Sequence, residues 1–95
     1  MASSRNYLEY ILEQFSPLEG LSFRPMMGEY LLYYQGKLIG GIYDDRLLLK
    51  PVKAALALLP EAPRVSPYPG AKEMLLVENV DDKAFLAELI TALGA

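Results

Sequence analysis

Few side chains in this sequence have the chemistry of a catalytic or metal-binding group. The chain contains no His and no Cys, so it lacks the commonest general base, the commonest metal ligand and any thiol nucleophile. A nucleophile–base triad for acyl transfer is therefore not expected. Two acidic pairs remain, Asp44-Asp45 and Asp81-Asp82. Adjacent carboxylates at a turn point apart, so Asp44-Asp45 does not predict a metal site. A carboxylate dyad stays open, but no pattern marks one, and we predict a protein that is not an enzyme, with no metal and no cofactor.

The remaining candidates are suited to binding. Arg24 has a planar guanidinium that could hold a carboxylate or phosphate, and its alternative roles are to pair with Glu29 or to lie at a sheet edge. Met26 and Met27 could offer a soft surface to a partner or fill gaps in the core. Four tyrosines could line a ligand pocket or form cross-strand pairs that stabilise a sheet. These are Tyr30, Tyr33, Tyr34 and Tyr43.

Most of these residues lie in a stretch, 22–50, that predicts three short strands joined by two tight turns. The strands are 30–34, 37–43 and 46–50. Gln35-Gly36 and Asp44-Asp45 supply the turns, because Gly and Asp tolerate the positive φ of two-residue hairpins. Gly40-Gly41 lies inside a strand and indicates a bulge or the close approach of another backbone segment. A further strand is expected at 21–24.

Helices are predicted on both sides of this stretch. Ser3 or Ser4 can cap a first helix, which Pro17 and Gly20 end. Its apolar face comprises Leu8, Ile11, Leu12 and Phe15. A second, short helix is expected at 52–59, where strong helix formers stand between two prolines.

The last third of the chain predicts a loop, a strand and a closing helix. Residues 61–70 hold three prolines and predict a loop with an edge strand near 64–66. A strand at 73–78 leads to a final helix, capped by Asn79 or Asp81 and ended by Gly94. The order α-β-β-β-β-α-(β)-β-α predicts one two-layer α+β domain over residues 1–95, with helices on one face of an antiparallel sheet.

Both faces of the predicted strands are apolar, which is unusual for an antiparallel sheet with one face in water. Leu32 points opposite to Leu31, and Leu48 opposite to Leu47. We expect the helices to cover one face and a second subunit to cover the other, giving a homodimer. The candidate interaction residues are Arg24, Met26, Tyr30, Leu32, Tyr34, Ile39 and Leu48.

Charge and hydropathy indicate which partners and which cell compartment to expect. The formal net charge is -3, and the nine basic residues are scattered, which argues against direct nucleic-acid binding. No apolar run approaches the length of a membrane span, and the N-terminus lacks the apolar core of a signal peptide. We expect a cytoplasmic protein that does not contact membranes.

Several segments together resemble the N-terminal domain of the TfoX/Sxy family. They are 23–30 (FRPMMGEY), 33–37 (YYQGK), 42–50 (IYDDRLLLK) and Tyr68-Pro69. Members typically have an Arg-x-Met-Phe-Gly-Gly segment, an aromatic with a Gly turn, an aspartate turn with a Tyr-Leu-Lys strand, and a Tyr-Pro element. Here Met27 replaces the aromatic, Glu29 the second Gly, and Leu31 a small residue.

The resemblance covers most of the chain, from Leu8 onward, and implies a fold like that of the YgaC, TfoX N-terminal and secretion-chaperone group. Full-length members add a C-terminal helical domain, so we interpret this chain as the N-terminal module standing alone. The family name derives from regulation of competence genes. The function expected is a non-catalytic protein-interaction module that regulates competence or transcription through a partner protein. The alternative is a domain that senses a small molecule through Arg24 and the sheet tyrosines.

Overall fold

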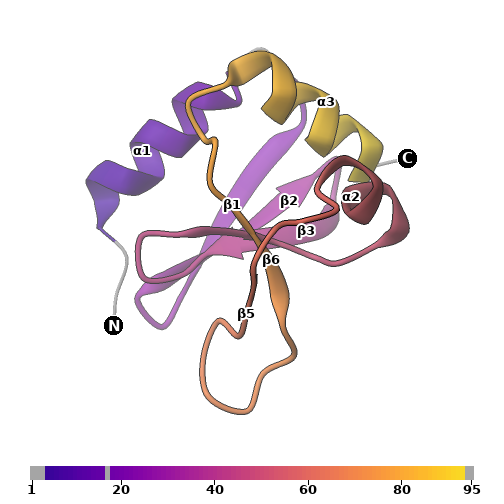
Figure 1. Ribbon diagram of the computed structural model, residues 1–95. Coiled ribbons are helices and arrows are strands. Elements are labelled where there is room, and N and C mark those ends of the chain that lie inside the picture. Colours follow the sequence, from indigo (N-terminus) through magenta and orange to yellow (C-terminus); the bar gives the residue numbers. More distant parts are fainter. Residues whose placement is uncertain (1–3, 17, 94–95) are drawn as a thin grey trace.

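The structure is a computed structural model that describes residues 4–16 and 18–93. Within these residues, three helices and six strands follow one another along the chain (Figure 1). In chain order they are α1 (Arg5–Gln14), β1 (Leu21–Met26), β2 (Glu29–Tyr34), β3 (Lys37–Ile42), β4 (Leu47–Leu49), α2 (Lys53–Leu58), β5 (Arg64–Val65), β6 (Met74–Val77) and α3 (Lys83–Leu93). Every strand and helix predicted from the sequence is present, with ends that differ by a few residues.

All six strands form one antiparallel sheet in the order β1-β2-β3-β4-β6-β5. The first four strands form a meander, and the chain then passes through α2 before β5 and β6 extend the sheet. Helices α1 and α3 lie over one face, with α2 beside α3, while the loop joining β5 to β6 projects on the other side (Figure 1). The predicted α+β architecture, with an antiparallel sheet and helices on one face, is confirmed.

Three hairpins of the meander close through two-residue turns with positive φ at both central positions. The predicted turns at Gln35-Gly36 and Asp44-Asp45 have φ of 52° and 82°, and of 52° and 54°. A third turn at Met27-Gly28, with φ of 51° and 86°, joins β1 to β2. This backbone matches the right-handed twist of the strands. The hairpins therefore fix the register of β1, β2, β3 and β4 locally.

Gly40 and Gly41 lie where other backbone segments come close, as predicted. A Cβ atom on Gly40 would overlap the carbonyl oxygen of Leu48 on the neighbouring strand. The register between β2 and β3 also shifts between Leu32 and Tyr33, so Ile39 stands as the extra residue of a bulge. The double glycine thus permits both the bulge and tight contact between β3 and β4.

The hydrophobic core lies between the sheet and the helices. Helix α1 contributes Leu8 and Ile11, α3 contributes four residues, and strands β2, β3, β4 and β6 contribute their inward-facing side chains. The fully or nearly fully buried members are Leu8, Ile11, Phe15, Leu32, Ile39, Ile42, Leu47, Leu49, Ala55, Leu75, Val77, Leu86, Leu89, Ile90 and Leu93. We call the sheet face that contributes to this core the inner face, and the opposite face the outer face.

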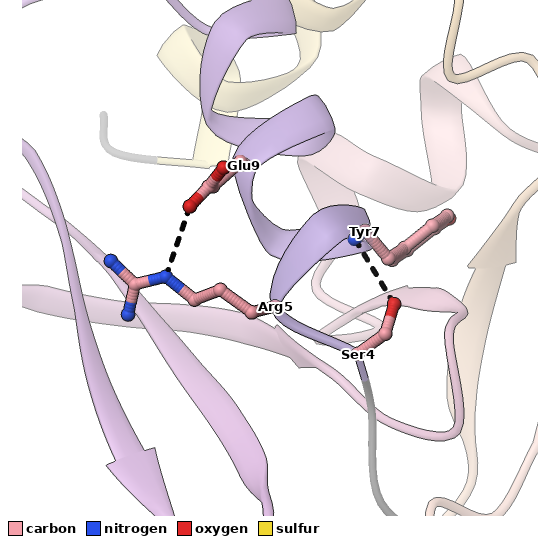
Figure 2. Close-up of polar contacts among 4 residues, drawn as sticks. All are labelled: Ser4, Arg5, Tyr7 and Glu9. Atoms are coloured by element: carbon pink, nitrogen blue, oxygen red, sulfur yellow. Dashed lines mark hydrogen bonds and ion pairs between the residues drawn. The ribbon is translucent and has the colours of Figure 1, made fainter.

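Helix ends agree with the predicted caps in one case and differ in another. Ser4 caps α1, because its Oγ accepts a hydrogen bond of 3.1 Å from the amide of Tyr7 (Figure 2). The cap of α3 is Asp82 rather than Asn79 or Asp81: its Oδ1 accepts from the amide of Phe85 at 3.0 Å. Only Asp82 stands directly before the first helical residue. Ser3, Pro17 and Gly94, also predicted to bound helices, lie outside the described residues.

Arg5 on the first turn of α1 connects that helix to the sheet. Its Nε lies 3.2 Å from Oε2 of Glu9, an exposed i, i+4 ion pair (Figure 2). Its guanidinium carbon also lies 5.8 Å from the centre of the Phe23 ring on β1. An exposed ion pair of this kind contributes only a few tenths of a kcal/mol. The contact between Arg5 and Phe23 is therefore the interaction that joins α1 to β1.

Candidate functional site

A row of side chains crosses the outer face of the sheet from strand to strand. The register pairs Arg24 with Leu31, Leu31 with Gly41, Gly41 with Leu48, and Leu48 with Leu76. Cross-strand partners point to the same face, so these five residues share the outer face. Leu48 is fully buried, yet it does not belong to the core on the inner face. The outer face therefore has a cover of its own around Leu48.

Tyr43 supplies part of this cover. A Cβ on Gly41 would lie 2.7 Å from Cε2 of Tyr43 and 2.6 Å from the carbonyl oxygen of Tyr30, so only glycine leaves room for the ring. The Tyr43 side chain is consequently 5% exposed. Burial raises the pKa of its hydroxyl, and the nearby Tyr68, Glu29 and Tyr33 raise it further. The ring of Tyr43 thus gives the outer face a neutral, largely apolar surface.

The loop between β5 and β6 supplies a second wall, and a groove of about 300 Å³ lies between it and the sheet. On the sheet side the groove is lined by Leu31, Leu38, Tyr43 and Met74. On the loop side it is lined by Pro67 and Tyr68. The prolines of this loop restrict its backbone, so the wall is held with less conformational freedom than an ordinary loop of its length.

The groove is apolar and open to solvent. Leu38 is 37% exposed and Tyr68 is 56% exposed, which is high for side chains of this size. Three charged residues also line it, Lys50, Lys72 and Glu73, so the local charge is slightly positive in a chain of net charge -3. Such a surface can take up an apolar side chain and attract an acidic neighbour.

Both a family model and a known bacterial protein match most of this chain. A family model described as the TfoX N-terminal domain matches residues 13–89. This chain belongs to the TfoX N-terminal domain family. It is also 35% identical over 85 residues to an "Uncharacterized 12.7 kDa protein in trpE 5'region" of Spirochaeta aurantia, a match that covers 88% of this chain and 73% of the relative. No solved structure matches the chain. The resemblance seen in the sequence is confirmed.

Family membership and the described residues set coarse bounds on activity. The TfoX N-terminal family is not a known enzyme family. Across residues 4–16 and 18–93, no group of three or more His, Cys, Asp or Glu side chains is arranged to hold a metal ion. In the same residues, no helix has the length and apolarity needed to cross a membrane.

This TfoX N-terminal domain distributes the predicted interaction residues over both faces of its sheet. Leu32 and Ile39 are 0% and 1% exposed and belong to the core on the inner face. Tyr30 and Tyr34 are half-buried against that same core. Leu48 lies on the outer face but is fully buried.

Arg24 and Met26 both lie on β1 at the edge of the sheet, and both retain access to solvent. Arg24 borders a shallow depression with Ser22, Phe23, Tyr33 and Gly36. Tyr30 and Tyr34 belong to the other face, so they do not form one pocket with Arg24. The role of the predicted residues in partner binding stays a prediction.

Sequence reasoning missed most of the groove. Leu38, Pro67 and Met74 were not candidates, because each is an ordinary apolar residue in its own segment. Two signals could have pointed to the site. Gly41 beside an aromatic two residues later indicated a ring packed over a bare backbone, and the Tyr68-Pro69 element marked the loop.

Proposed function

We propose that this TfoX N-terminal domain is a non-catalytic, cytoplasmic binding module whose outer-face groove receives an apolar side chain of a partner protein. The observation that carries the proposal is the groove itself, formed by Tyr43 over Gly41 and by the proline-containing loop at Tyr68. Its apolar lining remains partly exposed in the single chain. Exposed apolar surface rimmed by polar residues is typical of protein-interaction sites.

The charges around the groove favour a particular sequence in the partner. Lys50 and Lys72 are exposed and line the groove, with Glu73 as the one acid among the lining residues. Lysine attracts carboxylates over a distance of about 8 Å at physiological ionic strength. We therefore expect a partner segment with a large apolar residue flanked by Asp or Glu.

A peptide library displayed on phage, selected against the purified protein, tests this proposal. The selected sequences should contain an apolar residue next to acidic residues, and their binding should weaken as salt is added. Tyr68→Ala and Leu38→Glu should each reduce the affinity of a selected peptide at least tenfold. Tyr10→Ala is the matched control, because Tyr10 is 40% exposed on helix α1.

The outcome separates protein binding from the small-molecule alternative. Selected peptides that bind Tyr68→Ala and the parent protein equally would contradict the groove as a peptide site. A metabolite that raises the melting temperature of the parent but not of Tyr68→Ala would favour small-molecule sensing instead, because a ligand of the native state stabilises it by mass action. The groove volume of about 300 Å³ is at the small end of ligand pockets.

We further propose that the partner acts in gene regulation, including competence. Family membership supports this, because the family name derives from competence regulation. A two-hybrid assay of the parent and of Tyr68→Ala against transcription factors and RNA polymerase subunits of the source cell tests it. An interaction lost in Tyr68→Ala and kept in Tyr10→Ala would support the role, and the absence of any such interaction would contradict it.

A further inference from the structure

The two edges of the sheet differ in their capacity to pair with another strand. Strand β5 forms one edge and is only two residues long, with Pro63 directly before it and Pro67 shortly after it. Short strands and prolines are typical devices that prevent edge-to-edge association. Strand β1 forms the other edge and runs over six residues with one proline. Among the described residues, β1 is therefore the edge with the longer pairing surface.

The hydrogen-bond pattern identifies which backbone groups of β1 point away from the sheet. Just before β1, the amide of Gln35 donates to the carbonyl oxygen of Gly20 at 2.8 Å. Bonded pairs alternate along an antiparallel ladder, so Ser22, Arg24 and Met26 bond to β2. Leu21, Phe23 and Pro25 must then direct their backbone groups outward. Leu21 and Phe23 each present an N–H and a C=O, whereas Pro25 presents only its C=O.

An apolar hollow adjoins the same edge. It has a volume of about 470 Å³ and lies between the C-terminal end of α1 and β1. Leu12, Leu18, Leu21 and Phe23 line it, and each of these side chains is only half-buried. Leu21 and Phe23 thus combine unpaired backbone groups with side chains that are incompletely covered. A strand added at this edge would meet both requirements.

We propose that β1 pairs antiparallel with β1 of a second copy of this chain, about a two-fold axis at Ser22. In this register Leu21 of each copy lies opposite Phe23 of the other, and the two residue pairs exchange four backbone hydrogen bonds. A register centred on Phe23 would set Leu21 against Pro25, which has no N–H to donate. The position of the proline therefore favours the axis at Ser22 over one at Phe23.

Side chains on both faces of the junction suit a second copy. On the inner face Leu21 would lie against Phe23 of the other copy, which continues the apolar core across the axis. At the ends of the pairing, Arg24 would come near Glu19 of the other copy, and both side chains are exposed here. The edge is thus self-complementary in hydrogen bonds, apolar contacts and charge.

The paired segment is short, so we infer a reversible dimer rather than an obligate one. Interfaces that bury less than about 1,200 Å² in total are typically weak or transient. This dimer uses β1 and the end of α1, and it shares no residue with the groove lining described above. A test of this dimer is therefore independent of a test of the proposed function.

Cysteine crosslinking tests the register, because the parent chain has no Cys. In the proposed dimer the two copies of Ser22 form a non-hydrogen-bonded pair with Cα atoms about 4.5 Å apart, which suits a disulfide. S22C should therefore form a covalent dimer in a glutathione redox buffer. Arg24→Cys is the matched control, since its two copies would lie roughly 13 Å apart along the strands. Equal crosslinking of the two variants would overturn the proposed register.

Amide hydrogen exchange of the unmodified protein gives a second, independent test. Exchange at Leu21 and Phe23 should slow at least tenfold between dilute and concentrated samples, because their amides become bonded only in the dimer. Exchange at Ser22 and Arg24, whose amides bond to β2, provides the internal control. A protein that stays monomeric at about 1 mM, or a dimer with unchanged exchange at Leu21 and Phe23, would overturn the proposal.

Discussion

At the scale of single residues, Met27 is the least favourable choice for its position. Its φ of 51° lies in the left-handed region, and its side chain is 96% exposed, so no packing offsets the strain. Asn is the residue that tolerates this first position of a type I′ turn best after Gly. We predict that Met27→Asn raises the free energy of unfolding by about 0.5–1 kcal/mol.

Urea and thermal denaturation measure this effect, and the melting temperature should rise by roughly 2–8 °C. Met27→Leu provides the control, because it keeps an apolar side chain without the preference for positive φ. A gain of equal size in Met27→Leu would mean that removal of the thioether, and not relief of backbone strain, causes the change.

The glycine pair illustrates what single residues can and cannot reveal in advance. Gly40-Gly41 inside an apolar strand predicted a bulge or a close approach, and both are present. The sequence did not identify the approaching group at Gly41, which is the ring of Tyr43. A glycine in a strand indicates that another group packs closely against the backbone. Which group this is depends on the fold of the whole sheet.

At the scale of elements, the cap of α3 makes a direct test. The Asp82 carboxylate accepts from the Phe85 amide, and its charge also lies at the positive end of the helix dipole. Asp82→Ala should lower the free energy of unfolding by about 1 kcal/mol. Asp81→Ala, one residue earlier, is the control and should cost less than half as much. Equal losses of stability in the two variants would show that negative charge near the helix N-terminus matters and the cap hydrogen bond does not. Urea denaturation distinguishes the two results.

Strands and turns that short sequence patterns mark were predictable. The segments that pack over each face of the sheet were not. Two-residue turns of Gly and Asp fixed the hairpins, and alternation separated Leu31 from Leu32 correctly. Because both sets of alternate residues are apolar, the sequence could not say which set faces the helices. The predicted interaction residues therefore mixed the two faces, and Leu32 proved to be core.

The cover of the outer face was missed for a related reason. It comes in part from the loop at Pro67 and Tyr68, which lies about twenty residues or more along the chain from the strands it approaches. Irregular proline-containing segments have no hydrophobic period that predicts their contacts. The expectation that a second subunit covers this face did not include a contribution from the chain itself.

At the scale of the whole molecule, the groove and the β1 pairing edge lie on different parts of the sheet. The groove lies on the outer face against the loop, and the pairing edge lies at β1 beside the end of α1. The two sets of lining residues have no member in common. A dimer joined through β1 would therefore present two grooves, and a partner with two binding segments would gain avidity without any new contact.

The stability of the whole fold should also depend on alkaline pH through two tyrosines. Burial raises the pKa of Tyr43 above its ordinary value of 10.0, and Tyr68, Glu29 and Tyr33 add to the effect. Burial likewise raises the pKa of Tyr7, with Asp45 and Tyr10 adding to it and the backbone of Leu47 opposing it. The unfolded chain then releases these protons more readily than the native chain.

Stability from these groups is consequently complete below pH 10 and is lost as the pH rises through the native pKa values. We predict that the free energy of unfolding of the parent falls above about pH 10, and falls less steeply in the double variant Tyr7→Phe/Tyr43→Phe. Urea denaturation at pH values from about 8 to 11.5 measures both curves. The difference between them should be constant below pH 9.5 and should change in favour of the variant above pH 10. A difference that stays constant over the whole range would mean that neither hydroxyl is held in its neutral form by the fold.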